Sequence, residues 1–214
     1  MKLVIGDKNY SSWSMRPWLA AKAAGIAFEE QQIWLRQPDT SERIRALSPN
    51  GKVPALIAED GAVFESIAIL EYLAELAPSL WPEDRAARAH ARSICAEMHA
   101  GFVALRNRCP MNIRRVPKAI ALEADVRANI ARIVAMWSDC RARYGDGGDF
   151  LFGRFTNADA MFAPVVNRFH VYAVPVPAVV RTYMDAVIAT PAWQEWEAAS
   201  RAETSTIADT DAVA

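Results

Sequence analysis

Apolar and polar positions follow two different periods at the start of the chain. The short apolar run from Leu3 to Gly6 has the length of a buried strand, and apolar residues then recur at helical spacing from Met15 to Ala23. Proline is tolerated in the first turn of a helix, so Pro17 places the helix start near residues 12–14, and Gly25 supplies a C-cap. The pattern therefore predicts a strand over residues 2–6 and a helix over 14–24.

The same alternation continues to residue 76. A second strand is expected near 28–34 and a short helix near 40–47, followed by strand-like runs at 54–58 and 62–64 around Asp60-Gly61, a dipeptide favoured in tight antiparallel hairpins. Ser66 is expected to cap a helix over 67–76 that ends at Ala77-Pro78. Alternating strands and helices predict a layered α/β domain over residues 1–77.

The rest of the chain has helical periodicity. Helices are expected at about 84–108, 118–143, 157–171, 177–188 and 191–201, which makes an all-α domain over 86–203 after a proline-interrupted linker at 78–85. Thr156 to Asp159 has the spacing of a capping box at the start of the third of these helices. Residues 204–214 are small and polar and offer little to bury, so disorder is predicted there.

Composition excludes several classes of function. The chain has 214 residues, of which 52% are hydrophobic, and this is ample for a core. Lys and Arg number 24 against 25 Asp and Glu, and the basic residues are dispersed, which argues against nucleic acid as a partner. No apolar stretch approaches the length of a membrane span or of a signal-peptide core, so no membrane partner and a cytoplasmic location are expected.

Cysteine and histidine give no metal or redox signal. The three cysteines, Cys95, Cys109 and Cys140, match neither a zinc nor a dithiol spacing and are expected to be reduced packing residues. The three histidines stand apart in the sequence, so no metal site is expected.

The candidate chemistry lies at the predicted helix starts. Ser11 falls on a strand-to-helix turn beside unpaired N–H groups, and the partial positive charge of such a terminus favours an anion, including a thiolate. Without other landmarks in the sequence, Ser11 and Ser12 would be interpreted as helix caps and not as ligand-binding residues. Two later landmarks, Lys52-Val53-Pro54 and Glu65-Ser66, make a binding site for a thiol peptide the better interpretation.

These landmarks resemble the cytosolic glutathione transferases over residues 2–201. Ser11 to Arg16 resembles the S-S-C-x-W-R motif of the zeta class, which includes glutathione-dependent maleylacetoacetate isomerases, but Trp13 stands in place of the cysteine and Met15 in place of the tryptophan. The resemblance implies a thioredoxin-like N-terminal domain followed by an all-helical domain. It also implies a homodimer that uses glutathione as cosubstrate and needs no metal.

The resemblance assigns the sulfur contact to Ser11. A cysteine thiol with a pKa of about 8.5 is mostly protonated at pH 7, and lowering that pKa by two units needs about 2.7 kcal/mol of differential stabilisation. A hydroxyl donor at a helix terminus can supply this. Ser12 and Tyr10 remain alternative donors, since tyrosine-type transferases use a phenol near the end of the first strand.

Four further positions are implied to hold the tripeptide. The Val53-Pro54 bond would be cis, with the backbone of Val53 pairing with the cysteinyl part of glutathione; an edge-strand trans proline is the alternative. Glu65 would meet the ligand's ammonium and Ser66 its γ-glutamyl carboxylate. Lys52 would meet the glycyl carboxylate, although an ordinary surface lysine explains it equally well.

An electrophile pocket is expected between the two domains, where small-molecule sites tend to form. Arg106-Asn107 falls where zeta-class members have a polar pair facing this cleft, and Trp13 and Met111 are candidates for its apolar wall. A solvated arginine face and ordinary core packing are the competing explanations.

The predicted function is a serine-type glutathione transferase that adds the activated thiolate to a small electrophile. A specialised isomerase of the maleylacetoacetate or maleylpyruvate type, or a dehalogenase using the same site, is one alternative. A non-catalytic binding protein with this fold is the other.

Overall fold

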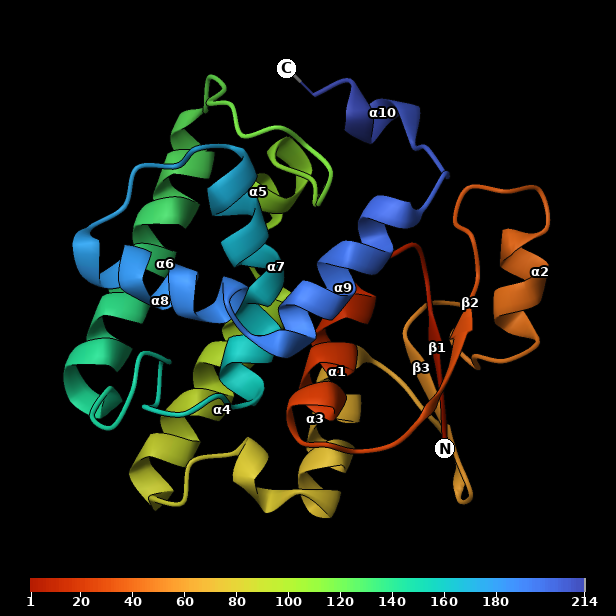
Figure 1. Ribbon diagram of the computed structural model, residues 1–214, viewed down its shortest axis with the longest axis horizontal. Coiled ribbons are helices and arrows are strands. Elements are labelled where there is room, and N and C mark those ends of the chain that lie inside the picture. The colour runs from red at the N-terminus through yellow and green to blue at the C-terminus, as the bar shows by residue number, and fades with distance from the viewer. Residues whose placement is uncertain (214) are drawn as a thin grey trace.

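A computed structural model describes residues 1–213 of the chain and divides them between a sheet with flanking helices and a helical bundle (Figure 1). In the N-terminal part the order of elements is β1 (Lys2–Ile5), α1 (Ser12–Ala23), β2 (Glu29–Gln32), α2 (Thr40–Arg45), β3 (Ala55–Ala58), β4 (Gly61–Val63) and α3 (Ser66–Leu76). The strand order is β2-β1-β3-β4, with β1 parallel to β2 and antiparallel to β3, and with β3 and β4 forming the predicted hairpin. This is the thioredoxin-like α/β arrangement.

The period-two pattern of β1 separates the two faces of the sheet. Leu3 and Ile5 belong to the main core, on the side of α1 and α3. Val4 points the other way and packs in a smaller cluster with Ile44 of α2. The sheet is therefore covered on both sides, with α2 alone on the outer face (Figure 1).

The C-terminal part is helical, as predicted. Its elements are η1 (Pro78–Leu80), α4 (Arg85–Ala100), α5 (Val103–Arg108), α6 (Ala124–Tyr144), α7 (Asn157–Val171), α8 (Ala178–Ile188), α9 (Pro191–Ala202) and α10 (Ala208–Asp211). The single helix predicted over 84–108 is two helices, because Phe102 adopts a left-handed conformation with φ of 58° directly after Gly101. A Cβ at position 101 would stand 2.8 Å from the carbonyl oxygen of Glu97, so glycine permits this close approach.

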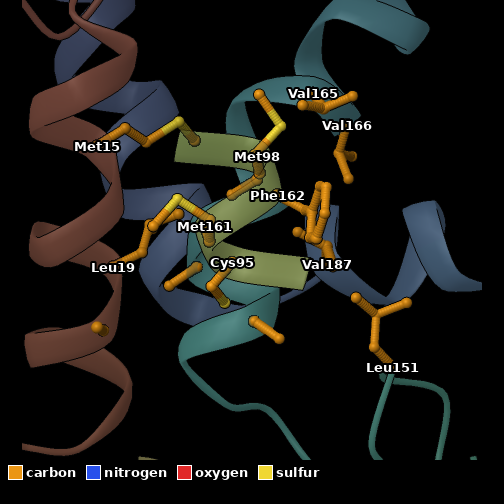
Figure 2. Close-up of a cluster of buried hydrophobic side chains, with 14 of the residues drawn as sticks. Met15, Leu19, Cys95, Met98, Leu151, Met161, Phe162, Val165, Val166 and Val187 are labelled. Carbon is orange, nitrogen blue, oxygen red and sulfur yellow. The ribbon is translucent and has the colours of Figure 1, made fainter. Parts of the chain in front are cut away.

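An apolar contact joins α1 to the bundle. Met15 and Leu19 of α1 point toward Cys95 and Met98 of α4 and toward Met161 of α7 (Figure 2). These side chains belong to one buried cluster that runs without a break from the sheet to the helical part. Pro17 is the sixth residue of α1 rather than part of its first turn, so its position in the helix differs from the prediction.

The capping box at the start of α7 is confirmed. The carboxylate of the buried Asp159 accepts hydrogen bonds from the backbone N–H of Thr156 at 2.7 Å and of Leu151 at 3.1 Å. The Thr156 hydroxyl in turn accepts from the N–H of Ala158 at 3.3 Å. Burial raises the pKa of the Asp159 carboxyl to about 6, and the hydrogen bonds to its ionised form oppose that rise.

Residues 204–213 differ from the disorder predicted for 204–214, of which residue 214 lies outside the described residues. Residues 208–211 form α10 (Figure 1). Side chains of the tail hydrogen-bond to the segment between β1 and α1. These polar contacts explain the difference, because the tail is held by hydrogen bonds where apolar burial is small. Within residues 1–213, no helix combines the length and the apolar character needed to cross a bilayer.

The raised pKa of Asp159 predicts a specific pH dependence of stability. Its value of about 6 in the folded chain exceeds the unfolded value of about 3.9, so its ionisation weakens the folded state as pH rises through 6. Relative to Asp159→Asn, the wild-type free energy of unfolding should increase by up to about 3 kcal/mol as pH falls from 7 to 4. Urea unfolding of both proteins across this range measures the difference. A constant difference between them would contradict the prediction.

Candidate functional site

Ser11 lies at the junction between the sheet and α1. It is the N-cap residue of α1, yet its side chain makes no capping hydrogen bond, so the interpretation of Ser11 as a plain cap is wrong. Its Oγ instead lies 2.8 Å from the Oγ of Ser14, which accepts a hydrogen bond from the backbone N–H of Gly6 at 3.1 Å. Ser14 is fully buried, and the sequence analysis missed it. Its spacing of three residues from Ser11, one helical turn, is the signal that could have revealed it.

The two alternative donors are engaged elsewhere. The Oγ of Ser12 lies 3.5 Å from Nη2 of the buried Arg168. The phenol of Tyr10 donates to the carboxylate of Asp211 at 2.8 Å and accepts from Nη2 of Arg114 at 2.8 Å. Tyr10 is thus part of a polar network with the tail.

The loop before β3 is fixed by a residue that the sequence analysis also missed. Val53-Pro54 is a cis peptide, and Pro54 is buried. Asn50 accepts the backbone N–H of Lys52 at 3.0 Å through its side-chain oxygen and donates from Nδ2 to Glu65 at 3.1 Å. Asn50 therefore joins this loop to the start of α3, while the Lys52 side chain is exposed.

Glu65 and Ser66 occupy the start of α3, with Glu65 as N-cap and Ser66 as first helical residue. The prediction that Ser66 caps this helix is wrong, because its hydroxyl makes no capping bond. The Ser66 Oγ is buried and has no hydrogen-bond partner among the described residues. A buried hydroxyl of this kind, at a helix N-terminus, fits a carboxylate ligand.

Cations surround the Trp13 ring. The guanidinium of Arg106 lies 5.2 Å from the ring centroid and that of Arg16 lies 4.0 Å from it, while the His99 ring makes an edge contact at 5.3 Å. The break between α4 and α5 places Arg106 here, and its Nη1 donates to the carbonyl of His99 at 3.3 Å. Burial, followed by the nearby Arg16, lowers the pKa of His99 and so favours the neutral imidazole.

The other two candidates for the pocket, Asn107 and Met111, differ in burial. Asn107 is exposed, and Met111 is 2% exposed within the main core. Both stay predictions as lining residues, and core packing accounts for Met111.

Two buried arginines lie behind this site, and the sequence analysis did not single them out. Arg16 donates from Nε to the Met161 carbonyl at 3.0 Å, but its Nη1 and Nη2 have no partner in residues 1–213. Arg168 donates from Nε to the Cys109 carbonyl at 2.8 Å. Burial lowers the pKa of Arg16 well below its ordinary value, with a further contribution from Arg168, and burial lowers the pKa of Arg168 to about 10. At a pKa of about 10, Arg168 stays protonated at neutral pH, and among residues 1–213 no acid is hydrogen-bonded to either guanidinium.

The arrangement is suited to an organic anion. It combines a hydroxyl at the start of α1, a buried hydroxyl at the start of α3 and guanidinium groups beside Trp13. Among residues 1–213, no group of three or more potential metal ligands comes together.

Comparisons with known proteins agree with this geometry. The chain is 27% identical over 183 residues to a probable maleylacetoacetate isomerase of Caenorhabditis elegans, covering 81% of this chain and 82% of that protein. It is 27% identical over 192 residues to glutathione S-transferase Z2 of Arabidopsis thaliana, covering 82% and 84% of the two chains. A glutathione transferase homologue from Burkholderia GL BGR1, solved with bound glutathione, superposes with a TM-score of 0.69 at 26% identity and covers 94% of this chain and 98% of its own.

Two family models match consecutive parts of the chain. The model of the glutathione S-transferase N-terminal domain matches residues 10–76, and that of the C-terminal domain matches residues 86–199. The chain therefore belongs to the glutathione S-transferase family.

Proposed function

We propose that this protein is a serine-type glutathione transferase in which Ser11 stabilises the glutathione thiolate. The observation that carries the proposal is a pair of linked hydrogen bonds at the start of α1: the Gly6 N–H bonds to the Ser14 hydroxyl, and the Ser14 hydroxyl bonds to that of Ser11. In the structure the Ser11 hydroxyl donates to Ser14; because a serine hydroxyl can both accept and donate, Ser14 can instead donate to Ser11 when Ser11 turns its proton toward a ligand. The Ser11 proton is then free to point toward a sulfur atom in front of the helix.

Thiolate formation follows from hydrogen bonding and charge. A hydroxyl that donates to the ionised sulfur, together with the N-terminus of α1, lowers the pKa of the thiol. The positive charge of Arg168, whose pKa of about 10 keeps it protonated at neutral pH, acts in the same direction. The thiolate then attacks the electrophilic carbon, a carbon–sulfur bond forms, and the leaving group departs with its electron pair.

The loop at Val53-Pro54 and the start of α3 are proposed to hold the tripeptide. The Val53 backbone pairs with its cysteinyl unit, and the Ser66 hydroxyl and N–H receive its γ-glutamyl carboxylate. Glu65, oriented by Asn50, receives its ammonium group, and Lys52 its glycyl carboxylate. The unpartnered Ser66 Oγ supports this assignment.

A second candidate is glutathione-dependent cis-trans isomerisation of an acidic diene. The guanidinium of Arg106 beside Trp13 supports binding of a carboxylate-bearing substrate, as does Arg16 at 4.0 Å from the same ring, whose Nη1 and Nη2 have no partner among residues 1–213. The C. elegans relative carries an isomerase name. In this reaction the thiolate adds to the conjugated system, rotation occurs about the bond that has become single, and the thiolate leaves unchanged.

Family membership also supports the homodimer that the sequence analysis expected. We propose that the dimer forms through α3 and α4, whose described surface includes Leu76 at 52% exposure and a hollow of about 400 Å³.

The first prediction concerns the bound thiol. In the wild-type protein, ultraviolet titration of bound glutathione should give a thiol pKa below 7, and Ser11→Ala should raise it by about one unit toward the free value near 8.5, because the helix N-terminus and the buried positive charge remain. Ser12→Ala serves as the matched control and should shift the pKa far less. A thiol pKa that is unchanged in Ser11→Ala would contradict the role of Ser11.

The second prediction separates the two candidate reactions. Arg106→Leu should raise KM for an acidic diene about tenfold, the value of one charged hydrogen bond, and should leave KM for a neutral aryl halide within about twofold. The control is Arg108→Leu, whose guanidinium faces Glu123 and the Ala121 carbonyl instead. Steady-state kinetics with both substrates tests this. Equal changes for both substrates would exclude a carboxylate contact at Arg106.

A further inference from the structure

Residues 203–213, called here the C-terminal strap, lie against the segment that joins β1 to α1. Glu203 accepts the backbone N–H of Lys8 at 2.7 Å through one carboxylate oxygen and that of Asn9 at 2.9 Å through the other. Ser205 donates to the carboxylate of Asp7. The strap thus satisfies two consecutive peptide N–H groups of a loop that has no ladder partner.

Tyr10 is the second point of attachment. Its phenol donates to Asp211 of the strap and accepts from the backbone N–H of Ile207 at 3.2 Å. Asn112, in the loop after α5, also donates to Asp211 at 2.8 Å. Tyr10 is 9% exposed and Asn112 is buried, whereas Asp211 is exposed, so only the Tyr10 end of this network is shielded from solvent.

Arg114 joins the strap and the loop. Its Nη2 donates to the Tyr10 phenol at 2.8 Å and to the Ser205 carbonyl at 2.6 Å, and its Nη1 donates to the Glu203 carbonyl. Its backbone N–H donates to the side-chain oxygen of Asn9 at 2.9 Å. Strap, helical domain and loop therefore form one hydrogen-bonded unit directly before Ser11.

We propose that Glu203 and Tyr10 are positioning residues that hold the loop 7–10, and through it the Ser11 hydroxyl, in the geometry that stabilises the thiolate. The inference rests on the proposed role of Ser11. Tyr10, Ser11 and Ser12 are adjacent in the chain, so a shift of the loop moves Ser11 with it. Misplacement of a catalytic group by about 1 Å can cost up to a hundredfold in rate, whereas binding of the tripeptide through Pro54 and Ser66 is left intact.

The test compares Glu203→Ala, Tyr10→Phe and the double variant with the wild-type protein. Glu195→Ala is the matched control, because Glu195 lies on α9 and forms an exposed ion pair with Lys22. The measurements are the pKa of bound glutathione thiol, kcat and KM, and amide hydrogen exchange at Lys8 and Asn9. Thermal unfolding verifies that each variant is folded at the assay temperature.

Each single variant should raise the thiol pKa and lower kcat about tenfold, with KM for glutathione within about twofold. The double variant should be little worse than either single one, because both substitutions release the same loop. Amide exchange at Lys8 and Asn9 should accelerate in Glu203→Ala and stay unchanged in Glu195→Ala.

Two results would overturn the inference. One is faster exchange at Lys8 and Asn9 with an unchanged thiol pKa and kcat, which would show that the loop is held without consequence for Ser11. The other is a thiol pKa that rises in Tyr10→Phe but not in Glu203→Ala, which would make the Tyr10 phenol itself the hydrogen-bond donor to the sulfur. If glutathione bound to the wild-type protein has the same thiol pKa as free glutathione, the proposed function itself is contradicted, and the inference fails with it.

Discussion

The packing of α1 against α7 is the contact on which the site depends. Met15 and Leu19 bury one face of α1 in the bundle, and the Arg16 side chain crosses to the Met161 carbonyl of α7. The opposite side of α1 covers the sheet through Leu3 and Ile5. Since α1 is fixed from both sides, the position of its first turn, and therefore of Ser11 and Ser14, is set by the core and not by the loop alone.

The same packing buries two arginines that have carbonyl partners but, among residues 1–213, no hydrogen-bonded acid. Two nitrogens of Arg16 have no hydrogen-bond partner within the part of the chain that the structure describes, and Arg168 donates to the backbone carbonyls of Cys109 and Pro164. Burying a cation without an acid costs free energy, as the lowered pKa values of both groups indicate. An anion that enters beside them recovers part of that cost. The folded chain is in this sense prepared for a negatively charged ligand before the ligand arrives.

Much of the fold was predictable because its signals are local. The strand at Leu3, the hairpin at Asp60-Gly61 and the Thr156–Asp159 capping box each follow from residues close in sequence. The break between α4 and α5 at Phe102 was not predictable, because a bulky residue in the left-handed conformation is stable only where the surrounding structure imposes it. The spacing of apolar residues gives no sign of this break.

The candidate site was predicted only in its outline. The sequence located Ser11, Pro54 and Ser66, which lie at turns and helix starts with recognisable chemistry. It missed Asn50 and Ser14, whose roles depend on partners in space, and it predicted disorder where the strap is held to Arg114 and Tyr10. The hydrogen bonds of the strap join residues about a hundred positions or more apart and leave no periodic trace in the sequence, whereas those of Ser14 and Asn50 are short-range but depend on a turn geometry that the pattern does not show.

The location of the strap has a practical consequence for handling the protein. A purification tag or fusion partner attached after the strap would begin close to Tyr10 and Arg115. Tyr10 bonds to Asp211 of the strap, and Nη1 of Arg115 donates to the Val213 carbonyl. One attached at the other terminus would leave from the start of β1, at the opposite end of the sheet from the first turn of α1 (Figure 1). An amino-terminal label is therefore the better choice for preparing material whose kinetics are to be compared between variants.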